Sequence, residues 1–218
     1  MKNGLLATVA TAMLFLACTQ ANAEDATPGN GMYVSVFGGA SFPENVKTKV
    51  SSLTYSLDLK TGYLLGGAIG MNITDMIRGE VELSHSSWKA DSYVRTGGKS
   101  GSGSAAGSIN STYVLANVWV DMNNDTAFTP YAGGGAGVGW ADGNAKFSGG
   151  GYGNGEAGFA FEVGVGLKYD LTENIGLDLG YRYKSILNVD FQYLGSTNVY
   201  KSGDVSSHDV QLGLTYSF

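Results

Sequence analysis

The sequence of 218 residues has one cysteine, three prolines and few charges, which make up only 15% of the chain. The cysteine, Cys18, precedes the expected mature protein, which excludes a small disulfide-rich secreted fold. Arginine occurs three times, the formal charge is −6 and no basic run is present, so we expect no nucleic-acid partner. After residue 23 no run of about 18 apolar residues occurs, and no membrane-spanning helix is predicted.

The first 23 residues have the three parts of a secretory signal peptide. Lys2 supplies the positive charge, residues 4–17 are apolar, and a small-residue motif ends at Ala23, so cleavage is expected between Ala23 and Glu24. A lipoprotein cleavage box that ends at Cys18 is the alternative. We expect a signal peptide at 1–23, a short leader at 24–31 and one β-barrel domain at 32–218.

Apolar residues alternate with polar or small ones along most of the mature chain, with the two-residue period of a β-strand. This pattern predicts an all-β protein of eight strands, at 32–42, 55–71, 77–87, 111–121, 128–141, 158–170, 175–186 and 208–218. In the second strand, for example, we expect Leu57, Leu59 and Tyr63 on the apolar face.

Nearly every charge in these strands falls in the phase opposite to the apolar residues. The predicted charged face comprises Asp58, Lys60, Arg78, Glu80, Glu82, Asp121, Glu162, Lys168, Asp178, Arg182, Lys184 and Asp209. A soluble sandwich or barrel would turn its apolar face inward, whereas a membrane barrel turns it outward to lipid and keeps the charges in its lumen.

Three features favour the membrane barrel. The signal peptide exports the chain, and strands of about ten residues tilted near 45° cover an apolar band of about 25 Å. Aromatic residues stand near strand ends, where membrane barrels have girdles: Phe42, Trp88, Phe128, Trp140, Tyr169, Tyr183, Tyr216 and Phe218. We therefore predict an eight-stranded antiparallel up-and-down transmembrane barrel, closed because unpaired backbone groups are costly in lipid.

The connections between the predicted strands alternate between short and long. Short turns at 72–76, 122–127 and 171–174 are typical of the periplasmic side of an outer-membrane barrel. Long loops are expected outside, at 43–54, 88–110, 142–157 and 187–207, and the Gly/Ser-rich ones are predicted to be mobile.

Several segments resemble the small outer-membrane β-barrel family, which includes OmpA-type domains and opacity-type surface antigens. They include Thr129-Pro-Tyr-Ala-Gly-Gly-Gly135, Leu179-Gly-Tyr-Arg-Tyr183 and the ending Gln211-Leu-Gly-Leu-Thr-Tyr-Ser-Phe218. The resemblance covers nearly all of residues 30–218 and implies an integral protein of the bacterial outer membrane. It also implies that Phe218 ends the signal read by the barrel assembly machinery.

The charged face has two interpretations. It forms either an ion network that fills a narrow barrel, since eight strands leave room for little besides side chains, or an ion path through a small porin. The glycines at 133, 135, 137 and 139 are expected to make room for bulky lumen side chains, or else to leave a gap in one wall.

One group of residues suggests an enzyme. His85 and Ser87 share the outward phase near the outer rim, as in some lipid-modifying barrels, but a triad also needs a carboxylate, and the nearest is Asp91 in a predicted loop. His208-Asp209 point to opposite faces. We expect no enzyme, no cofactor and no metal, but a surface-exposed structural or interaction protein. Its partners would be outer-membrane lipid, the assembly machinery and host or other extracellular ligands.

Overall fold

A computed structural model describes residues 31–50, 53–97, 100–122, 124, 126–148, 150–193, 199–201 and 203–218. This part of the chain contains fourteen β-strands and no helix. Accordingly, no described segment forms a helix that is long and apolar enough to cross a membrane. The predicted signal peptide and most of the predicted leader lie outside the described residues, and their assignment stays a prediction.

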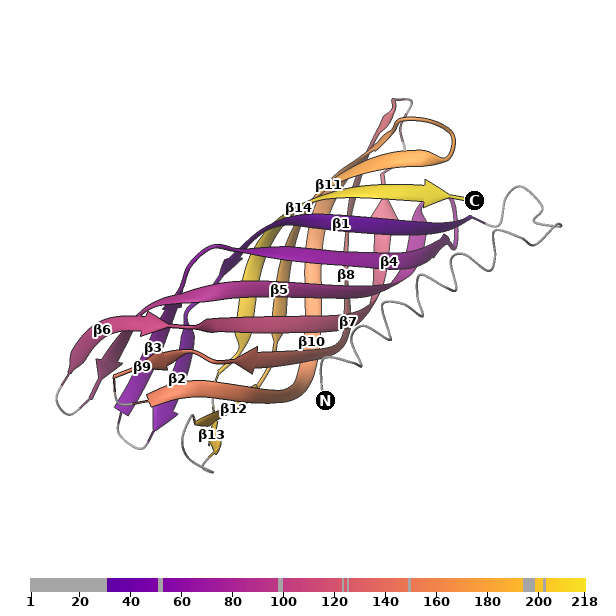
Figure 1. The fold of residues 1–218 in the computed structure, drawn as a ribbon. Helices are drawn as coiled ribbons and strands as arrows, with labels where there is room; N and C mark the ends of the chain where they lie inside the picture. The colour runs from indigo at the N-terminus through magenta and orange to yellow at the C-terminus, as the bar shows by residue number, and fades with distance from the viewer. Residues whose placement is uncertain are drawn as a thin grey trace.

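Eight antiparallel strands form a closed ring (Figure 1). In ring order they are β1 (Met32–Pro43), β4 (Gly62–Asn72), β5 (Ile77–Thr96), β7 (Ser108–Asp121), β8 (Phe128–Gly143), β10 (Gly150–Asp170), β11 (Ile175–Ile186) and β14 (Val205–Ser217). The seam is the pairing of β1 with β14, which runs from Tyr33↔Ser217 to Pro43↔Ser207. The predicted eight-stranded antiparallel barrel is therefore confirmed.

The register of the ring shows how steeply the strands tilt. Starting at Tyr33, paired residues lead around the barrel through Gly70, Glu80, Asn117, Gly135, Glu162, Lys184 and Ser207. The path returns to β1 at Pro43, ten residues beyond its start. This stagger, in a ring of eight strands, corresponds to a tilt of roughly 40° from the barrel axis.

The short turns and the C-terminus lie at one end of the barrel, which we call the turn end. There the Phe218 amide donates to the Met32 carbonyl oxygen at 3.0 Å, and Asn174 Nδ2 donates to the Ser217 carbonyl oxygen at 2.8 Å. Thr74 and Thr172 tighten two of the turns by accepting hydrogen bonds from the amides of Ile77 and Ile175. The last residues of the chain are thus fixed at the β1–β14 seam.

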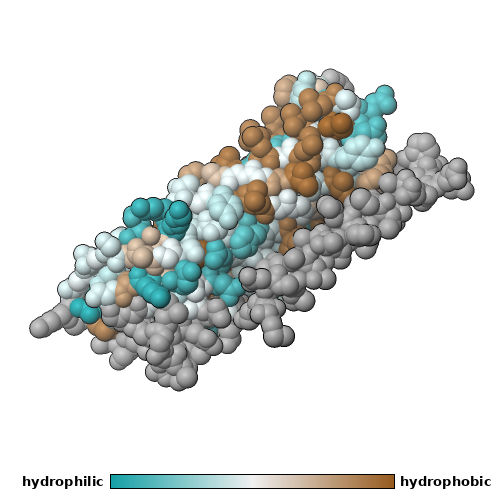
Figure 2. Space-filling view, viewed as in Figure 1, coloured by the Kyte–Doolittle hydropathy of each residue, from teal (hydrophilic) through white to brown (hydrophobic). Residues whose placement is uncertain are grey.

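Apolar side chains cover the outside of the ring next to the turn end. Val36, Leu65 and Leu212 are each at least 60% exposed, which a soluble protein would avoid across a continuous belt. Figure 2 shows these hydrophobic atoms gathered toward the turn end, while hydrophilic atoms lie toward the opposite end. Aromatic pairs such as Phe128–Tyr169, with ring centroids 4.8 Å apart, stand at the edge of the belt. The belt is the lipid-facing surface.

The wall continues beyond this belt into a second β structure, which we call the extension. It consists of β2 (Val46–Val50), β3 (Leu53–Leu59), β6 (Gly101–Ala106), β9 (Lys146–Phe147), β12 (Asp190–Tyr193) and β13 (Val199–Lys201), together with the ends of β5 and β10, on which β3, β6, β9 and β12 pair. In Figure 1 these strands gather at the end opposite the C-terminus.

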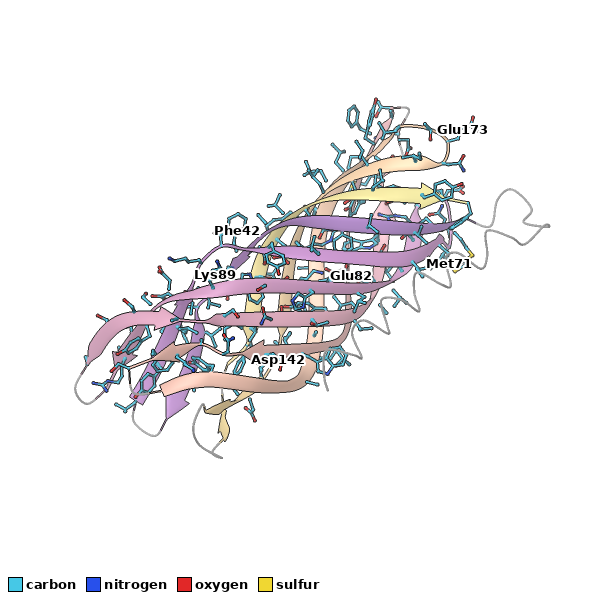
Figure 3. The ribbon with its side chains drawn as sticks, viewed as in Figure 1. Phe42, Met71, Glu82, Lys89, Asp142 and Glu173 are labelled. Carbon is cyan, nitrogen blue, oxygen red and sulfur yellow. The ribbon has the colours of Figure 1, made fainter. Side chains whose placement is uncertain are left out.

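The extension encloses an apolar core, so its two faces have the opposite chemistry from those of the membrane belt. Leu57, Trp88, Ile109 and Phe191 are at most 1% exposed there. Along β5, the inward-facing side chains change from the charged Glu82, through serines, to the buried Trp88. On the outward face of the same strand, the exposed residue next to Trp88 is the polar Lys89 (Figure 3). The reversal places the membrane boundary near the middle of β5.

The extension corrects three expectations. The predicted strand 55–71 is two strands, β3 and β4, and Leu57 lies in the extension core, not on the lipid face. Trp88 is buried and donates from Nε1 to Ser41 Oγ at 2.9 Å, so it does not belong to an aromatic girdle. The physical reason is the same for Leu57 and Trp88: alternation reveals which residues share a face, but not where that face passes from lipid to water.

The long outer connections are largely strands, contrary to the predicted mobile loops. Gly101–Ala106 pairs with residues 92–95 of β5 even though its composition is typical of a flexible linker. A neighbouring strand supplies the hydrogen-bond partners, and the small residues allow close packing: a Cβ added at Gly103 would come within 3.0 Å of the Tyr93 ring. Pairing with an existing strand therefore outweighs the weak β propensity of glycine and serine.

A charge on the lipid face should be costly in proportion to its depth. Val163 is half-exposed in the middle of the belt, and we expect Val163→Arg to lower the free energy of unfolding by about 2–4 kcal/mol. Phe42→Arg, near the outer edge, should cost about 0–1 kcal/mol. Urea titrations of barrels folded into lipid vesicles measure both. Equal costs at the two depths would contradict the assignment of the lipid face.

Candidate functional site

The lumen contains ten of the twelve charged residues predicted to line it. β5, β7, β10, β11 and β14 direct their side chains inward; Figure 3 labels Glu82 among them. The ten residues are Arg78, Glu80, Glu82, Asp121, Glu162, Lys168, Asp178, Arg182, Lys184 and Asp209. They form two groups, one near the turn end and one in the centre of the barrel.

Asp58 and Lys60 do not belong to the lumen, which corrects the prediction for both. Lys60 Nζ pairs with Asp91 Oδ1 at 3.1 Å, and both side chains are more than half exposed. Asp58 accepts a hydrogen bond from Ser92 Oγ at 2.8 Å within the extension. The strand is interrupted between β3 and β4. The inward or outward alternation of β3 therefore does not carry over into β4 of the barrel.

The turn-end network comprises Arg78, Glu80, Asp121, Lys168 and Asp178. Arg78 Nε and Lys168 Nζ lie 2.8 and 3.5 Å from Asp121 Oδ2. Glu80 accepts hydrogen bonds from three neutral donors: Tyr33 on β1, and Asn117 and Trp119 on the neighbouring β7. The network thus joins charges with aromatic and amide groups across the lumen.

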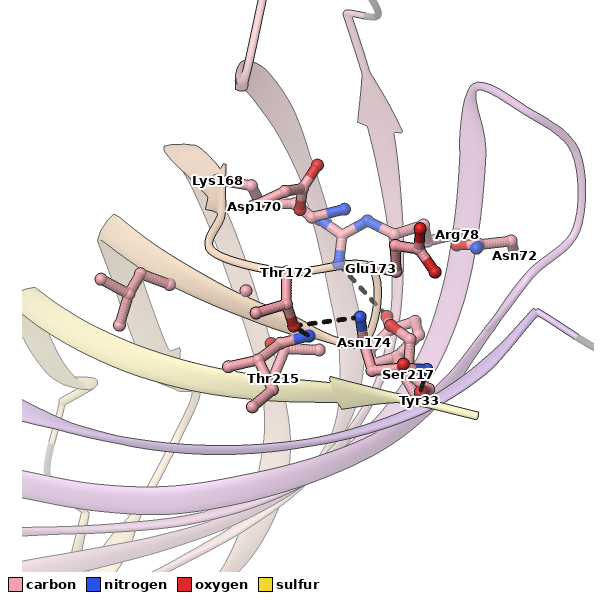
Figure 4. A pocket seen from close by; sticks show the side chains of 13 residues that line it. Tyr33, Asn72, Arg78, Lys168, Asp170, Thr172, Glu173, Asn174, Thr215 and Ser217 are labelled. Atoms are coloured by element: carbon pink, nitrogen blue, oxygen red, sulfur yellow. Dashed lines mark hydrogen bonds between the residues drawn. The ribbon is translucent and has the colours of Figure 1, made fainter.

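A pocket of about 50 Å³ opens beside this network, lined by Arg78 and Lys168 together with turn residues such as Thr172 and Asn174 (Figure 4). A second pocket, of about 30 Å³, lies further in, against Arg78, Glu80 and Arg182. Each holds about the volume of one or two water molecules. Water can therefore reach the turn-end charges, but these pockets leave no room for a solute.

The central network is built around Lys184, whose side chain is fully buried. Its ammonium group forms a short ion pair with Glu82 and lies 3.2 Å from Glu162 Oε2. Ser84 Oγ accepts a further hydrogen bond from the same ammonium at 3.0 Å. Three strands, β5, β10 and β11, are thereby joined through the middle of the barrel.

Arg182 is held mainly by aromatic groups and not by a direct ion pair. Its guanidinium carbon lies 4.2 Å from the centroid of the Trp119 ring, and its NH2 group donates to Tyr131 Oη at 2.7 Å. NH1 donates to the Val165 carbonyl oxygen at 3.1 Å. The guanidinium group therefore lies in the lumen between the two networks.

Hydroxyl groups lie between the central network and the apolar extension. Asp209 accepts hydrogen bonds from Ser41 and, at 3.3 Å, from Ser207. Ser41 in turn accepts the indole N–H of Trp88, which belongs to the extension core. Further into the extension, burial raises the pKa of Tyr152, whose hydroxyl is hydrogen-bonded to Thr48 at 2.8 Å. Along the lumen, the inward side chains thus change from charges to serines to aromatic rings.

The glycine stripe of β8 leaves no open gap among the described side chains. A Cβ at Gly133 would come 2.8 Å from the Trp119 ring, and one at Gly135 would come 1.9 Å from Asn117 Oδ1. At Gly139 the added atom would meet Ile186 at 2.5 Å. Bulky side chains from neighbouring strands thus occupy the space beside the glycines.

The sequence pattern placed Asn117 on the charged face, but it did not identify the aromatic members of the site. Tyr33, Trp119 and Tyr131 share hydrogen bonds or ring contacts with the lumen charges. All three fall in the same strand phase as the charges, and this phase is the signal that could have identified them.

The rim histidines have simple partners. His85 Nδ1 is hydrogen-bonded to Thr112 Oγ1 at 2.9 Å, while Asp91, the carboxylate considered for a triad, pairs with Lys60. His208 Nδ1 lies 2.6 Å from Tyr181 Oη, and its Nε2 lies 3.5 Å from Glu44 Oε1. No described set of three or more His, Cys, Asp or Glu side chains is placed to hold a metal ion.

Removing the central cation should leave buried carboxylates without their counter-charge. We expect Lys184→Met to lower the free energy of unfolding by about 3–5 kcal/mol. Lys60→Met, which breaks an exposed pair, should change it by less than about 1 kcal/mol. Denaturant titration in vesicles tests the pair. A similar small effect for both variants would mean that the central network does not stabilise the barrel.

Comparisons with known proteins agree with this architecture. Residues 9–218 match the family model "Outer membrane protein beta-barrel domain". The outer membrane protein PagN of Salmonella typhimurium is 34% identical over 125 residues, 50% of this chain and 51% of PagN, so the match spans about half of that relative.

Two solved structures have the same fold at low sequence identity. Neisserial surface protein A is 21% identical with a TM-score of 0.53, over 86% of this chain and 97% of its own. OprG of Pseudomonas aeruginosa is 16% identical with a TM-score of 0.57, over 89% and 99%. The apolar belt, the closed ring and the family match together show that this chain is an integral outer-membrane protein of the outer membrane protein β-barrel domain family.

Proposed function

We propose that the protein is a sealed barrel that anchors a folded β structure outside the cell, where the extension binds an extracellular partner. The observation that carries this proposal is the apolar core of the extension, including Leu57, Trp88 and Phe191. A core of this kind keeps outward side chains at defined positions, as a binding surface requires.

The lumen supports an anchoring role better than a transport role. The fully buried Lys184 and the stacked Arg182 cross its centre, and the aromatic rings of the extension lie above them. Tyr93 stacks on Phe147 with centroids 4.9 Å apart, and Tyr152 contacts Phe191 edge-on at 5.4 Å. An ion would have to displace both layers to pass.

We also propose that the protein is not an enzyme and that the assembly machinery reads its last residue. His85 bonds to a threonine, which cannot stabilise an imidazolium as the carboxylate of a triad does. Phe218 lies at the seam where the ring closes, a position consistent with a signal that acts when β14 meets β1.

A small porin is the second candidate, favoured by the two water-sized pockets that begin at the turn end. Conductance separates the two functions. We expect the purified barrel to show no steady single-channel current in a planar bilayer, because the central and aromatic layers block the lumen. Steady currents from the wild type would support the porin if they fall in Ala160→Phe, which places a larger side chain in the buried core, because such currents pass through the lumen.

If the extension binds a partner, reversing positive charges on its outer surface should weaken adhesion. Lys60, Lys89 and Lys146 are exposed in the extension, and we expect their joint substitution by Glu to lower binding of expressing cells to host-cell layers several-fold. Glu173→Lys, exposed at the turn end, serves as the control. Equal adhesion by both strains, with equal amounts of folded barrel, would contradict the proposed role.

A further inference from the structure

The central network has an excess of acid groups. Three carboxyl groups, from Glu82, Glu162 and Asp209, face two cations, Lys184 and Arg182. All five residues are at most 4% exposed, so bulk solvent screens the imbalance only weakly. An uncompensated charge in such a place is costly, and proteins usually avoid it by neutralising one group.

Glu162 is the group whose surroundings least suit a negative charge. Neither of its carboxyl oxygens accepts a hydrogen bond from a described residue, although both are buried. Its one close cation, Lys184, lies 3.2 Å away and is already bound closely by Glu82. Asp209, by contrast, is hydrogen-bonded to two serines.

The carboxyl groups of Glu82 and Glu162 are close neighbours, because an oxygen of each contacts the same Lys184 ammonium group. Two carboxylates in contact repel, whereas a carboxylic acid and a carboxylate attract through one shared proton. Glu82 also accepts from Asn117 Nδ2 at 3.4 Å, which favours the charge on Glu82.

We propose that Glu82 and Glu162 form a proton-binding site in the lumen, with one proton shared between them and held mainly on Glu162. The central network is then balanced, with two negative charges against Lys184 and Arg182. Asp209 from β14 and the neutral Tyr113 from β7 are the remaining titratable groups that face the pair. The residue opposite Glu162 on β8 is Gly135, which brings no further charge.

The bound proton links stability to pH in a defined direction. An unfolded glutamate loses its proton above about pH 4.3, whereas folded Glu162 keeps it, so the folded barrel holds one more proton than the unfolded chain. The free energy of unfolding should therefore fall as the pH rises from about 5 to 7. The unfolding equilibrium constant should rise by up to about tenfold per pH unit. Glu162→Gln, which mimics the neutral acid, should remove this component, while exposed Glu173→Gln should leave it.

Infrared spectroscopy detects the bound proton directly, and it can be applied to the wild-type protein. In a detergent without ester groups, the folded barrel at neutral pH should show the C=O stretch of a protonated carboxylic acid. We expect the Glu162→Gln spectrum to lack this band and the Glu173→Gln spectrum to retain it.

Three results would overturn the proposal. A wild-type spectrum without the band would mean that both carboxyl groups are ionised. A band that survives Glu162→Gln would place the proton elsewhere. The third result is a wild-type barrel that is more stable in sodium than in choline at equal ionic strength, with no such difference in Glu162→Gln. It would mean that an alkali cation, and not a proton, balances the charge of the site.

Discussion

The structure depends on one constraint: inside a bilayer every backbone N–H and C=O must pair within the protein. The ring meets this requirement by joining β14 to β1, and its ten-residue stagger determines the tilt of all eight strands. Closure also creates a lumen, and the remaining features of the barrel concern how that narrow space is filled.

Filling the lumen requires different chemistry at different depths. At the turn end, Arg78 and Lys168 share Asp121 beside a pocket that opens outward. In the centre, the side chain of Lys184 is fully buried and its ammonium group lies between the carboxyl groups of Glu82 and Glu162. Beyond the membrane, the same inward phase becomes apolar, because water now surrounds the outside of the wall and a hydrophobic core is stable again.

Much of this architecture could be predicted from the sequence, because a two-residue period directly reports which side chains share a face. The eight ring strands and ten lumen charges followed from it. The reversal of faces beyond His85 did not, since the same alternation fits either a lipid-facing or a water-facing wall; Leu57 and Trp88 were therefore placed outside. The strand at Gly101–Ala106 was missed because its stability comes from β5, a partner that local composition cannot reveal.

The central claim is that the wall is continuous while its lumen is closed to water at mid-height. The chain has one cysteine, before the predicted cleavage site, so single cysteines can replace serines of nearly the same size. Ser86 and Ser111 face each other across β5 and β7 and are buried, whereas Ser104 is exposed in the extension. The most direct measurement is the rate at which cysteines at these positions react with a small water-soluble thiol reagent in folded barrels. The account predicts rapid reaction at position 104 and protection at 86 and 111; rapid reaction at all three would show an open lumen and contradict it.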